Sequence, residues 1–141
     1  MAKCIDYVSL CRLPMSLLQN LTLYRSGLGA GISATAFMRH NISTAIVEID
    51  PAVYKAARTF FGLPDPANIF LEDAREWAAR KRAKIDAGHN EILFDIVVHD
   101  CFSGGGVPKH IYTLEFWSDL KAVMQPDGLL VVVRPFGSSI S

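Results

Sequence analysis

From Leu21 onward the chain alternates short apolar runs with amphipathic stretches, and this alternation constrains the fold more than any other feature. Apolar runs of strand length separated by helical patterns are typical of βαβ units, whose strands form a parallel sheet. The predicted strands are LTLY, TAIVEI, NIFL, FDIVVHD and LLVVV. The predicted helices are ISATAFMRH, DPAVYKAARTFFGLP, EDAREWAARKRAKI and TLEFWSDLKAVM. Five strands alternating with four helices predict an α/β, doubly wound domain with a mainly parallel sheet.

Local signals set some of the boundaries. Asp50 is a good N-cap, Pro51 fits the first helical turn, and Gly62 is suited to end the same helix. Asp73 is placed to cap the following helix. The stretch QPDG at 125–128 predicts a turn before the last strand.

Residues that bear chemistry stand where four of the predicted strands end. A glycine stretch, GLGAG at 27–31, follows the first strand, Glu48 closes the second, Asp73 follows the third and Asp100 closes the fourth. In open α/β sheets, ligands bind outside the carboxyl ends of the strands, where the strand order reverses. The pattern therefore predicts one binding site at that edge.

The glycine stretch suits a ligand that lies against bare backbone. Gly27, Gly29 and Gly31 have the spacing G-x-G-x-G, and Ile32 occupies the position of the third glycine in the dinucleotide fingerprint G-x-G-x-x-G. Glycine costs backbone entropy on folding, so the cluster needs a reason. A tight turn of this kind brings backbone N–H groups and a helix N-terminus toward a ligand, including a carboxylate.

The order of the acids points to an adenosyl amino acid. Glu48 is placed to accept both hydroxyls of a ribose, and Asp73 to accept a hydrogen bond from an exocyclic amine such as adenine N6. A carboxylate contact, a ribose acid and an adenine acid in this order describe an adenosyl amino acid better than a dinucleotide.

Structural interpretations stay open beside the functional ones. The glycines can serve only to form a turn. Glu48 can be a solvated residue at the end of a strand, and Asp73 can act only as an N-cap. Asp100 ends so apolar a strand that a functional role is favoured. His99 and His110 flank the predicted site without metal-ligand spacing, so no metal is expected.

Composition excludes several classes of function. The 141 residues fit one domain, and 14 basic and 14 acidic residues cancel. The basic cluster ARKRAK at 79–84 is interpreted as a solvated helix face, so no nucleic-acid partner is expected. The mildly apolar start is interrupted by charges and a proline, so no membrane span is expected. Three cysteines without metal spacing favour a reduced compartment, and we expect a cytoplasmic protein.

Together these motifs resemble the class I S-adenosylmethionine-dependent methyltransferase superfamily, with its Rossmann-like sheet. More narrowly, they resemble its spermidine/spermine synthase branch and related methyltransferase-like proteins. The resemblance covers 27–133 and rests on GLGAG, VEIDP, FGLP, EDA, FDIVVHDCFSGGGVP and LEFWSDLKAVMQPDGLLVVV.

The resemblance implies a role for each matching position. The co-substrate would be S-adenosylmethionine or its decarboxylated form, with no metal. Its implied binding residues are Gly27, Gly29 and Gly31 for the methionine part, Glu48 for the ribose, and Asp73 with Ala74 for the adenine. Asp100 matches the first acid of the synthases' D-S-S-D motif, which implies a catalytic role in orienting and deprotonating an attacking amine.

The sequence also departs from that pattern. Ser103 stands where the synthases carry a second acid, which makes it a candidate substrate-binding residue without the acid's charge. Arg25 and Ser26 precede the glycines, where apolar residues are expected. Residues 1–20 are interpreted as a variable N-terminal segment, and 21–141 as the nucleoside-binding domain. The family's last two strands would follow residue 141, so the fold is expected to be truncated at that end.

Three functions stay open. The leading hypothesis is an aminopropyl transfer to an amine, as in polyamine biosynthesis, with Asp100 as the base. The second is a methyltransferase of the same fold that acts on a protein or a small molecule. The third is a non-catalytic or truncated nucleoside-binding domain. A homodimer is compatible with all three.

Overall fold

A single parallel sheet organises the chain. The computed structural model describes residues 3–4, 20–102 and 106–133. Its strands are β1 (Lys3–Cys4), β2 (Thr22–Ser26), β3 (Ser43–Val47), β4 (Asn68–Phe70), β5 (Phe94–His99) and β6 (Met124–Val132). They pair in the order β1-β6-β5-β2-β3-β4, and every pair is parallel. The predicted doubly wound sheet is confirmed, and the short strand β1 extends it beyond β6.

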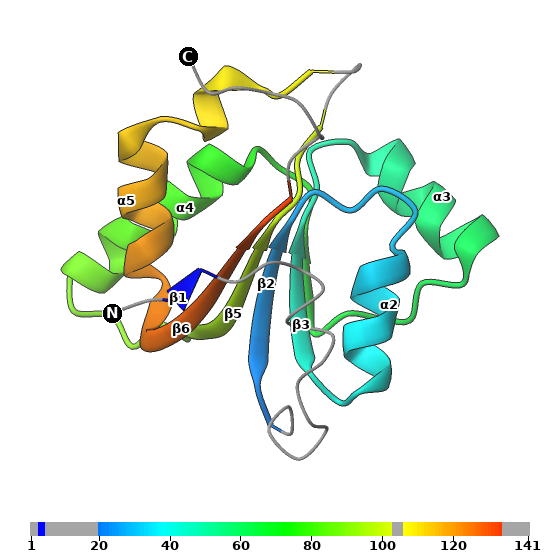
Figure 1. Cartoon of the computed structure of the whole chain (residues 1–141), viewed down its shortest axis with the longest axis horizontal. Helices are drawn as coiled ribbons and strands as arrows, with labels where there is room; N and C mark the ends of the chain where they lie inside the picture. The colour runs from blue at the N-terminus through cyan, green and yellow to red at the C-terminus, as the bar shows by residue number, and fades with distance from the viewer. Residues whose placement is uncertain (1–2, 5–19, 103–105, 134–141) are drawn as a thin grey trace.

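Helices cover the two faces of this sheet (Figure 1). The helical segments are α2 (Ile32–Arg39), α3 (Pro51–Phe61), α4 (Ala74–Asp86), the short 3-10 helix η2 (Lys109–Ile111) and α5 (Leu114–Ala122). In Figure 1, α2 and α3 lie on one side of the sheet, and α4 and α5 on the other. The chain runs outward from β2 through β3 to β4, then returns to β5 beside β2 and continues to β6. The strand order therefore reverses between β2 and β5, and ligands of such sheets bind at this point.

Short polar residues start two of the helices as predicted. Asp50 caps α3 by accepting a hydrogen bond from the backbone N–H of Ala52, at 2.8 Å. Asp73 caps α4 by accepting hydrogen bonds from the backbone N–H groups of Arg75 and Glu76. A good N-cap contributes about 1 kcal/mol, so these two acids help to fix where the chain leaves β3 and β4.

The alternation of side chains along the strands divides the core between the two faces. Tyr24 of β2 stacks on Trp77 of α4, with ring centroids 4.4 Å apart, and both side chains are fully buried. Leu23, the neighbouring residue of β2, packs on the opposite face with Phe37 of α2. Each buried side chain of this size contributes roughly 1.5–3 kcal/mol of hydrophobic stabilisation. The apolar runs in the sequence are therefore the two-sided core of the sheet.

The turn predicted at 125–128 is wrong as a strand boundary. Strand β6 already begins at Met124, which pairs with Phe94, and Leu129 pairs with Ile96. Residues 125–128 thus stand opposite the single residue Asp95 and bulge from the ladder. Proline and glycine in this stretch bend the strand locally without ending it.

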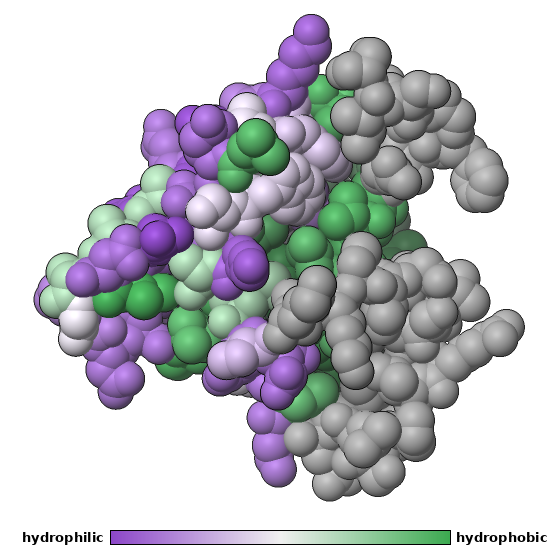
Figure 2. All heavy atoms as spheres, turned by 60° about the vertical axis from the view of Figure 1, so that its left-hand side comes forward, coloured by the Kyte–Doolittle hydropathy of each residue, from purple (hydrophilic) through white to green (hydrophobic). Residues whose placement is uncertain are grey.

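The basic cluster at 79–84 lies on α4 and is matched by acids. Arg80 pairs with Glu72 and Arg82 with Asp86, each at 2.7 Å, and Lys81 pairs with Glu91. Lys84 lies 3.8 Å from the same Glu91. Figure 2 shows hydrophilic residues spread over much of the described surface on this face of the molecule, with some hydrophobic residues among them. Among the described residues, no helix is long and apolar enough to cross a membrane.

Candidate functional site

The first glycine after β2 is required by the neighbouring strand. Gly27 has φ +81°, and a Cβ built on it would lie 2.0 Å from the carbonyl oxygen of Asp100. Its N–H donates to the carbonyl of Val47 at 3.0 Å. At this position, the group that lies against the glycine is the protein's own main chain, just after the ends of β2 and β5.

The second glycine leaves bare backbone toward open space. Gly29 has φ +56°, and a Cβ built on it would meet nothing within 4 Å. Gly31 precedes α2, where an added Cβ would lie 3.0 Å from Cδ1 of Leu63. Of the three glycines, Gly29 therefore combines a left-handed backbone with room for a ligand.

Glu48 fastens the glycine turn to the end of β3. Its side chain is buried, and Oε2 accepts the backbone N–H of Leu28 at 2.8 Å. Oε1 accepts the backbone N–H of Asp50 at 2.9 Å. The interpretation of Glu48 as a solvated strand end is wrong, because its side chain is buried and its carboxylate accepts hydrogen bonds from two backbone N–H groups. Each oxygen keeps acceptor capacity for a further donor.

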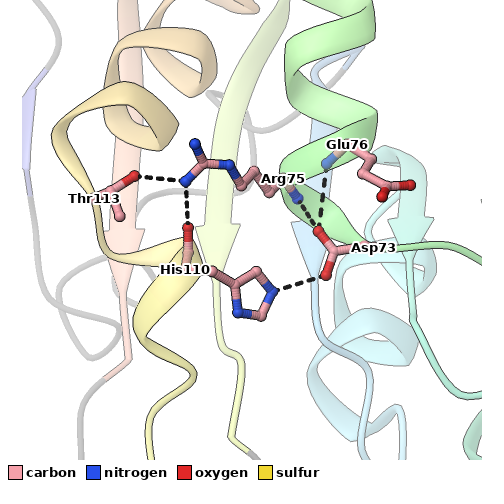
Figure 3. Close-up of polar contacts among 5 residues, drawn as sticks. All are labelled: Asp73, Arg75, Glu76, His110 and Thr113. Atoms are coloured by element: carbon pink, nitrogen blue, oxygen red, sulfur yellow. Dashed lines mark hydrogen bonds and ion pairs between the residues drawn. The ribbon is translucent and has the colours of Figure 1, made fainter.

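Asp73 has two different tasks, one for each oxygen (Figure 3). Oδ1 caps α4, while Oδ2 lies 2.8 Å from Nε2 of His110, on η2. Arg75 reinforces the contact by donating to the His110 carbonyl and to Oγ1 of Thr113, each at 3.0 Å. Burial alone would raise the pKa of Asp73, but the hydrogen bonds outweigh it and lower the pKa below its usual value. The capping interpretation holds, and it leaves Oδ2 on the side of η2.

Asp100 is paired with a buried cation. Nη2 of Arg25 donates to Oδ2 of Asp100 at 2.6 Å, and the Arg25 side chain is 4% exposed against 24% for Asp100. The backbone N–H of Asp100 donates to the carbonyl of Ser26 at 2.9 Å. The predicted catalytic carboxylate is therefore held by β2 through both its main chain and its side chain.

A second polar group lies under Asp100, on the α4 and α5 face. Oγ of Ser26 lies 2.7 Å from Nδ1 of His99, whose ring is fully buried beside Phe116 and Trp117. Burial lowers the pKa of His99 to about 4, so the ring is neutral at pH 7. Burial also raises the pKa of the Cys101 thiol to about 12, which leaves no thiolate for nucleophilic attack at neutral pH.

A cleft, which we call the rim cleft, lies at the carboxyl ends of β2, β3, β4 and β5. Its volume is about 390 Å³, within the range of roughly 300–1,000 Å³ that is usual for small-molecule sites. Six predicted site residues line it: Gly27, Gly29, Glu48, Asp73, Ala74 and Asp100. Gly31 is not in its lining. Ser103 lies outside the described residues.

The rim cleft also contains residues that the sequence did not single out with a role there. Pro108, His110 and Ile111 form a wall from η2 and the residue before it. Arg25 is not in the lining of the cleft but pairs with Asp100, which is. A charge inside an otherwise apolar strand must be paired if it is buried, so the sequence contains a signal that one of the strand-end acids is the partner of Arg25. Within the described ranges, no cluster of three or more His, Cys, Asp or Glu could hold a metal ion.

Curated relatives are methyltransferases and polyamine aminopropyltransferases. The chain is 40% identical over 106 residues to the N-terminal histidine N-methyltransferase of Emericella nidulans, covering 75% of this chain and 18% of that protein. It is 33% identical over 109 residues to the polyamine aminopropyltransferase of Vibrio vulnificus, covering 74% of this chain and 34% of that protein. Polyamine aminopropyltransferase 1 of Streptomyces coelicolor is 31% identical over 117 residues, with 20% of that protein covered. The chain thus spans at most about a third of the length of these relatives. No family model matches the sequence.

Solved structures show the same fold. Human methyltransferase-like protein 13, in complex with SAH, has a TM-score of 0.72 at 22% identity and matches 87% of this chain and 59% of its own. Spermidine synthase from Thermotoga maritima has a TM-score of 0.62 at 22% identity, over 84% of this chain and 40% of its own. The chain has the Rossmann-like fold of class I S-adenosylmethionine-dependent methyltransferases. Its homologues are methyltransferases and polyamine aminopropyltransferases, which confirms the resemblance seen in the sequence.

Proposed function

We propose that the rim cleft binds S-adenosylmethionine and that the chain directs methyl transfer to a nucleophilic acceptor. The observation that supports this most is the convergence of Gly29, Glu48, Asp73 and Asp100 on one cleft at the reversal of strand order. These residues come from four separate strand ends, and they meet at the position where ligands of open α/β sheets bind.

The residues present fit the chemistry of an adenosyl amino acid. Gly29 offers a backbone without a side chain and space beside it. Glu48 has acceptor capacity left after binding two backbone N–H groups, which suits ribose hydroxyls. Oδ1 of Asp73 is engaged in the cap and Oδ2 already contacts His110, but a carboxylate oxygen can accept more than one hydrogen bond, so Oδ2 can also accept from a donor such as the adenine amine. The nucleoside would therefore extend from the glycine turn, past β3, to the N-terminus of α4.

When bound, the sulfonium supplies an electrophilic methyl carbon whose bonding electrons leave on sulfur. The chain's contribution is to hold the acceptor in line with that carbon and to shield both from water. Asp100, the 24%-exposed acid beside the glycine turn, is the residue best placed to orient an acceptor. An N–H or O–H acceptor gives up its proton on transfer, and an acid at this position can accept it.

Methyl transfer is favoured over aminopropyl transfer by the state of Asp100. An aminopropyl acceptor is an alkylammonium ion, so the acid must attract a cation as well as accept a proton, and a carboxylate that is already paired with a cation attracts a second cation weakly. Here the Asp100 carboxylate is engaged by the Arg25 guanidinium at 2.6 Å. The relative with the highest identity among the three described above is also a methyltransferase.

Aminopropyl transfer is the second candidate, because two curated relatives are polyamine aminopropyltransferases and Asp100 matches their motif. Calorimetric titration with S-adenosylmethionine and with its decarboxylated form separates the two candidates. Methyl transfer predicts that the carboxylated form binds at least as tightly. A clear preference for the decarboxylated form would reverse the choice, and heat from neither would contradict both candidates.

A further inference from the structure

The guanidinium of Arg25 has unused donors at a buried position. Arg25 is 3% exposed, and in the sheet it lies between Ile46 of β3 and Val98 of β5. Nη2 donates to Asp100, while Nε and Nη1 are buried without a hydrogen-bond partner in the structure. Buried polar groups are nearly always satisfied, so this arrangement calls for an explanation.

Stability gives no sufficient reason for a cation at this position. Replacing a buried ion pair by apolar side chains is often neutral or stabilising. The backbone of Asp100 is already fixed without Arg25, by its N–H on the Ser26 carbonyl and by its close approach to Gly27. What Arg25 changes at the cleft is therefore the charge and orientation of the Asp100 carboxylate.

Each of the other acids of the rim cleft has a hydrogen-bond or ion-pair partner, and Glu72 is the one among them that pairs with an arginine. Both oxygens of Glu48 accept backbone N–H groups, and Asp50 caps α3. Glu72 pairs with Arg80, and Asp73 contacts His110. Asp100 follows β5 directly and adjoins Gly27, so the charge at this end of the cleft depends on whether Arg25 balances it.

We propose that Arg25 is a specificity-determining residue that excludes alkylammonium acceptors by balancing the charge of Asp100. The inference rests on the proposed function and adds the class of acceptor, which is an uncharged nucleophile. A compact ion pair attracts an incoming cation far less than a lone carboxylate does. The guanidinium lies next to the carboxylate, so its repulsion of the cation offsets most of the carboxylate's attraction. Arg25 acts through Asp100 and needs no contact with the acceptor.

The test compares Arg25→Met with Arg25→Lys. Methionine removes the charge at similar length, whereas lysine retains it as a matched control. Each protein is first titrated calorimetrically with S-adenosylhomocysteine and then with 1,4-diaminobutane, a dication that probes the acceptor end. We expect weak diamine binding to the unchanged chain and to Arg25→Lys, and binding at least about tenfold tighter to Arg25→Met. The gain should vanish in Arg25→Met combined with Asp100→Asn.

Equal diamine affinity in the unchanged chain and in Arg25→Met would overturn the inference. If Arg25→Met does not fold, the unchanged chain and Asp100→Asn decide the question. Tight diamine binding that is lost in Asp100→Asn shows that Arg25 does not exclude cations, and weak binding to both supports the inference. The titration with S-adenosylhomocysteine tests the proposed function separately. If the proposed function is wrong, this first titration gives no heat, and that result does not depend on how the diamine binds.

Discussion

Glu48 has a structural role in the fold and, under the proposed function, a second role in binding the ribose. It holds the glycine turn and the start of α3 in place through the N–H groups of Leu28 and Asp50. Such an acid can orient a ligand with little reorganisation, since its own position is already fixed by the fold. Because both oxygens already accept hydrogen bonds, replacing either oxygen by a donor should lower the stability of the fold and the affinity for the nucleoside.

Glu48→Gln should therefore weaken both the fold and nucleoside binding. The amide NH₂ would face a backbone donor, which leaves buried donors unsatisfied and costs about 1–3 kcal/mol of unfolding free energy. Affinity for S-adenosylhomocysteine should fall by about tenfold or more, equivalent to about 1.4 kcal/mol. Denaturant unfolding and calorimetry measure the two effects. Glu72→Gln is the matched control, because this cleft acid pairs with a half-exposed arginine and should change either quantity little.

His99 makes the stability of the chain depend on acid. Its pKa is lowered to about 4 by burial, whereas an unfolded histidine has a pKa of about 6.5. Between these values the unfolded chain binds a proton that the folded chain does not, so stability falls as the pH falls. The contribution is fully present above pH of about 6.5, and roughly 3 kcal/mol is lost on reaching pH of about 4.

His99→Gln removes this titration while keeping an acceptor for the Ser26 hydroxyl. Thermal unfolding measured between pH 7 and pH 4 should show a shallower decline for the variant, each protein compared with its own value at pH 7. Identical declines would mean that other groups cause the acid sensitivity. His89→Gln, at an exposed position after α4, controls for the loss of a histidine as such.

The sequence predicts single residues well where one local rule decides the outcome. The caps at Asp50 and Asp73 follow from their place before a helix, and the gathering of Glu48 and Asp100 follows from the geometry of parallel strands. The pairing of Arg25 with Asp100 depends on the register between β2 and β5, which no local pattern encodes. The contact between Asp73 and His110 likewise depends on how η2 packs beside α4.

At the scale of elements, the residues that follow β2 and β5 lie so close together that residue 27 has room for a hydrogen atom but not for a methyl group. Gly27→Ala should destabilise the chain by more than about 3 kcal/mol, since its Cβ would fall 2.0 Å from the Asp100 carbonyl and force the strands apart. Gly88→Ala is a matched control, because Gly88 has nearly the same φ, +80°, with nothing within 4 Å of its added Cβ. The control should lose only about 1–2 kcal/mol from backbone strain.

Chemical denaturation of both variants tests this assignment. Equal losses would show that the left-handed backbone, and not the approach of β5, explains the glycine at position 27. Gly27 and Gly29 are thus needed for different reasons. At Gly27 the protein's own main chain leaves no room for a side chain, whereas Gly29 faces open space that a ligand can occupy.

The predicted elements themselves agree closely with the structure, and the exception has a physical cause. Hydrophobic alternation locates β2 to β5 and all four longer helices within a few residues. Strand β6 begins earlier than predicted because its residues 125–128 bulge and then rejoin the ladder at Leu129. Proline and glycine indicate a bend in the sequence, but pairing with β5 decides whether the strand ends there.

At the scale of the whole molecule, the described part of the sheet has two hollows at opposite ends of its strands. The rim cleft lies at the carboxyl ends, and a second hollow of about 270 Å³ lies at the amino ends, lined by Thr22, Ser43, Asn68 and Phe94 among others. The rule for open α/β sheets favours the first hollow, because it lies where the strand order reverses. The proposed function therefore requires that the nucleoside bind in the rim cleft and not in the second hollow.

Amide chemical shifts of the ¹⁵N-labelled chain, titrated with S-adenosylhomocysteine, test that choice directly. If the nucleoside binds in the rim cleft, the chemical-shift changes should saturate and should be largest at the backbone N–H groups of Leu28, Gly29 and Ala74, around the cleft. Shifts centred on Thr22, Asn90 and Ile92, at the second hollow, would contradict it. So would a spectrum that does not change at any concentration of the nucleoside.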